Sequence, residues 1–185
     1  MTGPTEPNEP QAPEPLTPEL EARIAEIFGR RDREDMQPTI DAFLELLAEH
    51  PGQPEVLYEV GGSYDTAGEE QTALGYYEAA MAAGLSGDAL RRCLMQYGST
   101  LRILGRYDES LAALDRALEE YPDSASVRAF HALALHAAGR SDGAVGELLA
   151  LVADGMRIPD VQRYEAALRG NAAYLMQLDE ERPVD

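Results

Sequence analysis

Apolar residues recur at helical spacing through most of the chain, in short stripes separated by glycine or proline. Between residues 91 and 124, a first stripe repeats at intervals typical of one helix face, at Leu94, Tyr97, Leu101 and Leu104. Gly105 then marks a helix end, and a second stripe with a following proline comes after it, at Leu111, Leu114, Leu118 and Pro122. The pattern predicts a helical hairpin, which cannot bury its apolar faces without neighbours.

The same hairpin pattern recurs along the sequence. Gly105 and Gly139 are 34 residues apart, whereas the step back from Gly105 to Gly68 is 37 residues. We place the extra residues in a loop over 83–88, where an insertion is tolerated. With a fainter copy at the start, we expect hairpins at about 20–53, 54–90, 91–124 and 125–158. Hairpins repeated in this way stack into a solenoid, so the predicted fold class is all-α.

The repeat unit resembles the tetratricopeptide repeat. In the third hairpin the matching positions are Leu94, Tyr97, Gly98, Leu101, Ser110, Leu114, Ala117 and Pro122. Small residues such as Gly98 and Ser110 make sense where two helices cross, because a bulky side chain would overpack the crossing. The resemblance implies an α-solenoid of about three hairpins, a degenerate N-terminal hairpin and a C-terminal capping helix. The plan is similar to that of small bacterial tetratricopeptide proteins of the group 5 type, which makes a homodimer one implied property.

The last hairpin departs from the repeat pattern because its second helix contains Gly143 and Gly146. Each glycine costs about 1 kcal/mol relative to alanine inside a helix. We therefore expect this helix to depend on the segment that follows, a helix over about 160–178. We interpret that helix as the terminal cap that solenoids need. The alternative is a dimerisation helix, with self-association through Tyr164, Leu168 and Leu175.

The two ends of the chain differ in composition from the repeats. Residues 1–18 hold six of the twelve prolines, carry negative charge and offer nothing to bury, so we expect a disordered tail. A solubilising or linker tail is the first interpretation of this segment, and a proline-motif ligand is the alternative. The tetratricopeptide domain would then span 19–180, followed by a disordered C-terminus at 181–185.

Charge and composition narrow the classes of partner. With 34 acidic residues against 15 basic ones, all of them arginine, the formal charge is −19, which disfavours nucleic acid and anionic membranes. The longest apolar stretches fall short of the roughly 20 residues that span a bilayer, and the N-terminus lacks the pattern of a secretory signal. We therefore expect a soluble, cytoplasmic protein. Abundant alanine, glycine and arginine without lysine indicates a GC-rich bacterial source.

No residue pattern indicates catalysis. His131 and His136 are five residues apart and do not share a helix face as a metal-binding pair would. The lone Cys93 excludes a disulfide framework, has no paired base in the pattern and is interpreted as a packed residue. The sequence therefore predicts a protein that is not an enzyme and that holds no cofactor or metal.

Binding residues are expected on the first helices, which line the concave groove of the family that the chain resembles. From Arg91 to Tyr107 there are four arginines and no acidic residue. The resemblance places these residues in the groove: Tyr58, Asp65, Arg92, Met95, Ser99, Arg102 and His136. We expect the arginines to bind an acidic segment. The alternative is that Glu55–Arg92 and Asp65–Arg102 form ion pairs between repeats.

These patterns predict a non-catalytic protein–protein interaction module that holds a peptide or protein partner in its groove. The competing hypothesis is a structural protein that assembles into a homodimer through its terminal helices. A chaperone tail is not the expected ligand, because the lysines and asparagines of the family's carboxylate clamp are replaced by Ile24, Phe28, Tyr58 and Gly62.

Overall fold

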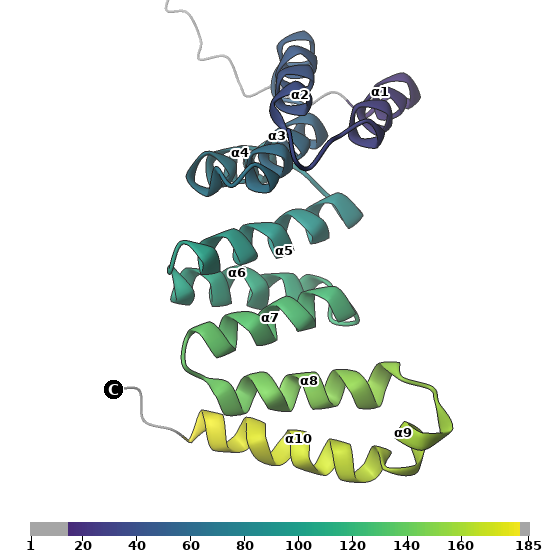
Figure 1. Ribbon diagram of the computed structural model, residues 1–185, viewed down its shortest axis with the longest axis vertical. Helices are drawn as coiled ribbons and strands as arrows, with labels where there is room; N and C mark the ends of the chain where they lie inside the picture. The colour runs from purple at the N-terminus through teal and green to yellow at the C-terminus, as the bar shows by residue number, and fades with distance from the viewer. Residues whose placement is uncertain (1–14, 182–185) are drawn as a thin grey trace, which may run out of the picture.

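Helices follow one another along residues 15–181, the part of the chain that the computed structural model describes (Figure 1). Four hairpins come first: α1 (Pro18–Gly29) with α2 (Gln37–Glu49), α3 (Pro54–Thr66) with α4 (Glu70–Ala82), α5 (Gly87–Ile103) with α6 (Tyr107–Glu120), and α7 (Ala125–Ala137) with α8 (Ser141–Gly155). The short α9 (Pro159–Arg163) and the longer α10 (Glu165–Glu180) come last. The described residues contain no strand.

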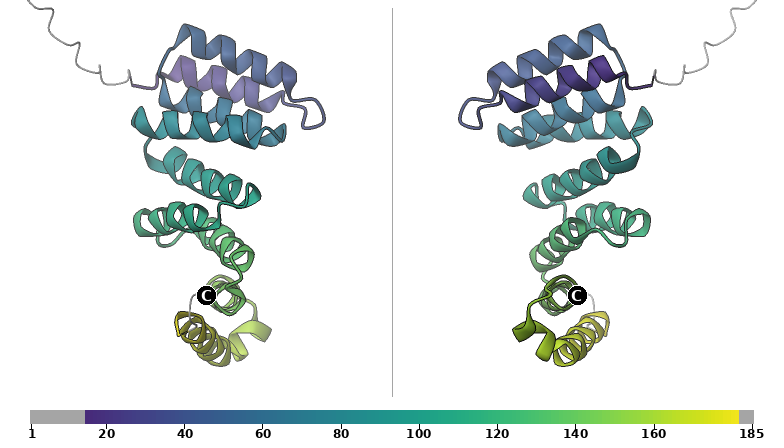
Figure 2. Two further views of the ribbon diagram at one scale, coloured as in Figure 1. Left: turned by 90° about the vertical axis from the view of Figure 1, so that its left-hand side faces the viewer. Right: turned by 90° about the vertical axis from the view of Figure 1, so that its right-hand side faces the viewer.

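The hairpins stack in chain order into a solenoid. Figure 1 shows α1 and α2 at one end of the stack and α10 at the other, and the side views in Figure 2 show the same order. Each second helix contacts the first helix of the next hairpin. Successive first helices also contact each other, α3 with α5 and α5 with α7, and form an inner row. This arrangement confirms the predicted all-α solenoid.

A glycine with positive φ ends the first helix of three hairpins. After α5, Gly105 has a φ of +75°, and the backbone N–H of Arg106 donates to the carbonyl of Leu101 at 2.9 Å. A Cβ is disfavoured in that left-handed conformation, so glycine stops the helix there. Gly68 and Gly139 repeat the turn with φ values of +78° and +80°, at the spacing of the sequence repeat.

Small residues allow the two helices of a hairpin to cross closely. A Cβ on Gly98 of α5 would lie only 2.6 Å from Cγ of Leu114 on α6. Ser110 Oγ donates to the Gly98 carbonyl across the same crossing, at 2.6 Å. In the preceding hairpin, a Cβ on Gly61 would lie 2.8 Å from Cδ1 of Tyr77. The predicted need for small residues at these crossings is therefore confirmed.

Two groups of buried apolar residues fill the stack. The N-terminal core consists of Leu20, Phe43, Leu46, Val56 and Val60. The central core is larger, runs from Tyr58 to Ala144 along the chain and includes Tyr77, Leu94 and Leu114. Cys93 belongs to the central core and is fully buried, as the sequence predicted. The partly buried Tyr64 packs against both cores and joins them.

The second helix of the last hairpin, α8, turns its glycines toward α10. A Cβ on Gly143 would lie 2.7 Å from Oδ2 of Asp179, and a Cβ on Gly146 would lie 2.9 Å from the carbonyl oxygen of Ala172. The Asp179 carboxylate also forms an ion pair with Arg140 at 2.6 Å. The glycines thus allow the close approach of α8 to α10, and the expected dependence of α8 on the segment that follows it stays a prediction.

The C-terminal end differs from the sequence prediction in two respects. The capping helix expected over 160–178 is interrupted at Tyr164, which lies between α9 and α10. Leu148, the repeat equivalent of the buried Leu114, is 42% exposed, and its neighbour Glu147 is buried instead. The Glu147 carboxylate contacts Nδ1 of His131 at 2.6 Å. Because the glycines of α8 pack against α10, the helix is rotated so that Glu147 is buried and Leu148 is exposed.

Some helix starts also differ from the predicted boundaries. The first helix begins at Pro18, inside the tail predicted over 1–18, because Thr17 caps it by accepting a hydrogen bond from the N–H of Leu20 at 3.2 Å. The third hairpin begins at Gly87, ahead of the predicted start at 91. Residues 1–14 and 182–185 lie outside the described residues, so the disorder predicted for the two ends stays a prediction. Within 15–181, every helix is too short or too polar to cross a bilayer.

Candidate functional site

Two adjoining pockets open on the inner row, where α1, α3 and α5 meet. The arginine pocket has a volume of about 220 Å³, and the residues that define it are Arg31, Arg33, Arg92, Glu59, Gly62 and Gln96. The apolar pocket has a volume of about 350 Å³ and is defined by Leu16, Ile24, Ala25 and Ala89. Phe28, Tyr58, Glu59 and Arg92 line both pockets, so the two cavities lie side by side.

Aromatic rings position two of the guanidinium groups. Cζ of Arg31 lies 3.6 Å from the ring centroid of Phe28, and Cζ of Arg92 lies 5.6 Å from that of Tyr58. Arg92 also pairs with Asp88, one turn earlier on α5, at 3.1 Å. Among the described residues, no carboxylate lies within ion-pairing distance of Arg31 or Arg33. Positive charge therefore remains available at this pocket.

Glu59 lies between the two pockets and is half-buried. Burial raises the pKa of its carboxyl group above the ordinary value, and the nearby guanidinium groups of Arg92 and Arg31 oppose that rise. Within residues 15–181, no hydrogen bond or ion pair satisfies this carboxylate. The carboxylate borders the two cavities and has no protein partner there, so Glu59 is a group to which a ligand can donate a hydrogen bond.

Acidic side chains also surround the apolar pocket. Glu21 from α1 and Glu55 from α3 line it together with Glu59. The Glu55 carboxylate accepts a hydrogen bond from Nε2 of Gln53 at 2.6 Å. The apolar pocket thus combines hydrocarbon walls with negative charge, while the arginine pocket beside it is rich in positive charge.

A different contact joins α3 to α5 near the C-terminal ends of the two helices. Thr100 Oγ1 donates a hydrogen bond to Oδ1 of Asp65 at 2.8 Å. Burial raises the pKa of Asp65, and the hydrogen bond from Thr100 opposes that rise. The ion pairs Asp65–Arg102 and Glu55–Arg92 predicted between repeats do not form among the described residues, and Nε of Arg102 is buried without a hydrogen-bond partner there.

Comparison with known proteins assigns the hairpins to a family. The family model described as Tetratrico peptide repeat matches residues 54–175, which is more than half of the chain. The chain is a tetratricopeptide repeat protein. Repeats of this family generally mediate protein–protein interactions and are typically non-catalytic. A search of curated proteins finds no match.

The matched region starts where α3 starts and ends within α10. It therefore leaves out the α1–α2 hairpin, which the sequence marked as a degenerate copy. In this tetratricopeptide repeat protein that hairpin supplies one wall of both pockets, through Phe28. The candidate site thus joins a divergent hairpin to two regular ones.

Of the groove residues predicted from the sequence, the structure places Tyr58 and Arg92 in both pockets. Met95 packs against the central core, and Ser99 is half-buried on α5. His136 is exposed on α7. These three residues, like Asp65 and Arg102, are not among the residues that line the two pockets, so the seven do not form one cluster.

Sequence reasoning missed Glu59, Arg31 and Arg33. Glu59 lies four residues after Glu55 and three before Gly62, so helical spacing places all three on one face of α3 and could have indicated it. The two arginines lie after the end of α1, in the loop that joins it to α2. No periodicity assigns a direction to side chains in such a loop.

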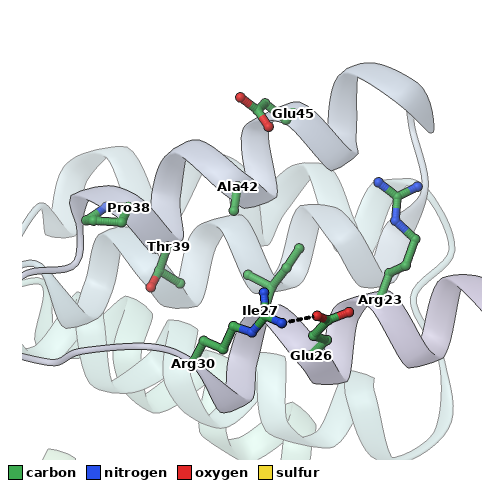
Figure 3. Close-up of a pocket in the computed structure, with 8 residues that line it drawn as sticks. All are labelled: Arg23, Glu26, Ile27, Arg30, Pro38, Thr39, Ala42 and Glu45. Atoms are coloured by element: carbon green, nitrogen blue, oxygen red, sulfur yellow. Dashed lines mark ion pairs between the residues drawn. The ribbon is translucent and has the colours of Figure 1, made fainter.

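A third pocket, with a volume of about 390 Å³, lies between α1 and α2 at the N-terminal end of the stack (Figure 3). Arg30 forms an ion pair with Glu26, drawn as a dashed line in Figure 3. Arg23 donates hydrogen bonds to both carboxylate oxygens of Glu49, at 2.6 and 3.1 Å. Because its arginines are already paired, this pocket offers a ligand less than the two inner pockets do.

The residues predicted for self-association lie at the other end of the repeat protein. Tyr164 is 56% exposed, whereas Leu168 and Leu175 are half-buried. Further exposed apolar side chains at this end are Val145, Leu148, Met156, Ile158 and Tyr174. These exposed apolar side chains contrast with the charged residues that line the inner pockets.

Proposed function

We propose that this tetratricopeptide repeat protein is a non-catalytic interaction module that holds a segment of a partner protein across the arginine pocket and the apolar pocket. The observation that supports the proposal is the set of charged side chains around these cavities that have no partner among the described residues. Arg31, Arg33 and Glu59 have no charged partner within hydrogen-bonding distance among the described residues. Three first helices contribute side chains to one small area, and that arrangement suits an extended segment.

Gly62 provides the test of this site. It lines the arginine pocket, and a Cβ built on it meets only Oη of Tyr77, at 3.9 Å. A larger side chain at this position therefore extends into the cavity without displacing α3. The Gly62→Leu variant should fold, should gain helix propensity and should block the pocket.

The matched control is Gly75→Leu. Gly75 also lies inside a helix, α4, but it is exposed and has no neighbouring atom within 4 Å of a built Cβ. Tagged wild-type and variant chains would be used to recover partners from cells of the source organism, followed by mass spectrometry. We expect a partner that is recovered by the wild type and by Gly75→Leu and lost from Gly62→Leu. A partner that Gly62→Leu retains at the wild-type level would contradict the proposal.

The exposed apolar residues at the C-terminal end favour homodimer formation as a second candidate function. In that case Tyr164 and Tyr174, which are 56% and 60% exposed, would be covered by a second copy. Sedimentation velocity of the wild type and of the Tyr164→Glu, Tyr174→Glu double variant tests it. A wild-type dimer that the double variant converts to a monomer supports self-assembly, and a monomeric wild type at high concentration rejects it.

A further inference from the structure

We propose that the partner segment carries a basic residue that enters the apolar pocket and an acidic residue that enters the arginine pocket. This inference rests on the proposed function, because it names the chemistry of the segment that the same site binds. It differs from the expectation drawn from the sequence, in which the arginines select an acidic segment alone. Opposite charges on the two adjoining pockets are the reason for the change.

The apolar pocket fits the side chain of lysine or arginine. Its walls include Leu16, Ile24 and Ala89, which suit a hydrocarbon stem. The residues around it contribute three carboxylates, Glu21, Glu55 and Glu59, against the one guanidinium of Arg92. Long basic side chains bury their methylene groups on apolar surface while the charged end remains among polar groups. A basic residue matches both properties, whereas a purely apolar residue would leave the Glu59 carboxylate without a partner.

Glu59 is the group that the cation would satisfy. The neighbouring acceptor Glu55 already receives a hydrogen bond from Gln53, and Arg92 already pairs with Asp88. Glu59 is half-buried, yet no hydrogen bond or ion pair reaches it within residues 15–181. Burial raises the pKa of its carboxyl group above the ordinary value, and the guanidinium groups of Arg92 and Arg31 oppose that rise. A bound ammonium or guanidinium group would stabilise the charged form of this carboxyl group.

The arginine pocket has the opposite character. The residues around it contribute the guanidinium groups of Arg31, Arg33 and Arg92 against the one carboxylate of Glu59. Arg31 lies over the Phe28 ring, and this cation–π contact favours one orientation of its guanidinium group. A guanidinium group binds a carboxylate through two parallel hydrogen bonds. An aspartate or glutamate side chain of the partner therefore fits this pocket.

The two residues of the partner must lie close together in its sequence. Phe28, Tyr58, Glu59 and Arg92 are shared by both pockets, so one wall separates the two cavities. In an extended segment, side chains two residues apart point in the same direction and are about 7 Å apart. We therefore expect the basic and the acidic residue to be separated by one residue.

The experiment is a selection from a random peptide library displayed on phage, with the full chain immobilised. Peptides enriched on the wild type would be synthesised with a fluorescent label, and their affinity would be measured by anisotropy. We expect enriched peptides to contain Lys or Arg two positions from Asp or Glu. Glu59→Gln should weaken their binding about tenfold or more. The same substitution should have little effect on a peptide whose basic residue is replaced by norleucine.

Arg33→Gln tests the other half of the pattern, and two exposed residues outside the site provide controls. Arg33→Gln should weaken the binding of the enriched peptides. It should have little effect on the binding of peptides whose acidic residue is replaced by the corresponding amide. Glu119→Gln and Arg157→Gln change the same residue types on α6 and after α8, and should leave affinity unchanged.

The outcomes separate this inference from the proposed function. Acidic peptides without a basic residue that bind the wild type and not Gly62→Leu would keep the groove as the site and overturn the charge pattern. Peptides that bind Gly62→Leu as well as the wild type would overturn the site itself. A selection that enriches no sequence would overturn both.

Discussion

The crossing of Gly98 and Leu114 gives the sharpest test of the packing. A Cβ on Gly98 would lie 2.6 Å from Cγ of Leu114, whereas carbon atoms in contact prefer about 3.5–4.0 Å. Overpacking of this kind costs about 1–3 kcal/mol, and replacing a helical glycine by alanine returns about 1 kcal/mol. Gly98→Ala should therefore lower the free energy of unfolding by about 0–2 kcal/mol.

Removing the opposing side chain should reverse the sign of this effect. Leu114 is fully buried, so Leu114→Ala alone should destabilise the protein by about 2–5 kcal/mol through the cavity that it leaves. In that background the Cβ added by Gly98→Ala no longer meets a leucine Cγ, and the substitution should stabilise the protein by about 1 kcal/mol through helix propensity. The coupling energy between the two sites should thus be about 1–3 kcal/mol.

Urea unfolding of the four proteins, followed by far-ultraviolet circular dichroism, measures each step of this cycle. Gly75→Ala is the matched control, because Gly75 is helical and has open space around it. It should stabilise both backgrounds by about 1 kcal/mol. Equal effects of Gly98→Ala in the presence and absence of the leucine side chain would refute the reasoning, since no contact between the two positions would then exist.

Three further predictions concern other parts of the molecule. Gly146→Val would bring a Cβ within 2.9 Å of the Ala172 carbonyl oxygen, so it should lower the free energy of unfolding by about 1–3 kcal/mol. The chain between α8 and α10 should also become more sensitive to limited proteolysis, and unchanged cleavage would contradict the packing. Arg128 and Arg169 lower the pKa of Asp154 below its usual value of 3.8, so the stabilisation is present at neutral pH and is lost as pH falls through the lowered pKa. Asp154→Asn should therefore lower the melting temperature at pH 7 and leave it unchanged in strong acid, and a pH-independent difference would reject this origin. Burial raises the pKa of the Cys93 thiol to about 12, so Ellman's reagent should react with it only after unfolding; rapid reaction in the native state would show that it is not buried.

The regular hairpins were predictable from the sequence because their signals are local. Gly105 requires a positive φ, Leu114 repeats at the helical period, and Gly98 must be small where it meets Leu114. Each of these constraints acts between residues of the same hairpin, so the sequence of that hairpin is enough to predict its two helices and their crossing.

The candidate site was less predictable because it depends on how separate hairpins meet. Arg31 and Arg33 lie in the loop between α1 and α2 of the degenerate first hairpin, and only the packing of that hairpin against α3 brings them to Arg92. The exposure of Leu148 has a similar cause, since the glycines of α8 pack on a helix outside the repeat. The burial of a residue can be inferred from the same position in another repeat only if both repeats pack against similar neighbours. The hairpins at the two ends of this stack do not.

The division of the interior into two cores has a consequence for local unfolding. Both pockets take lining residues from α1, which belongs to the N-terminal core, and from α5, which belongs to the central core. In a solenoid, a terminal unit opens independently when its contacts with the next unit are few. A bound segment that contacts both cores would join them into one cooperative unit. Amide hydrogens of α1 and α2 would then exchange more slowly, and their protection would report occupancy without knowledge of the ligand's identity.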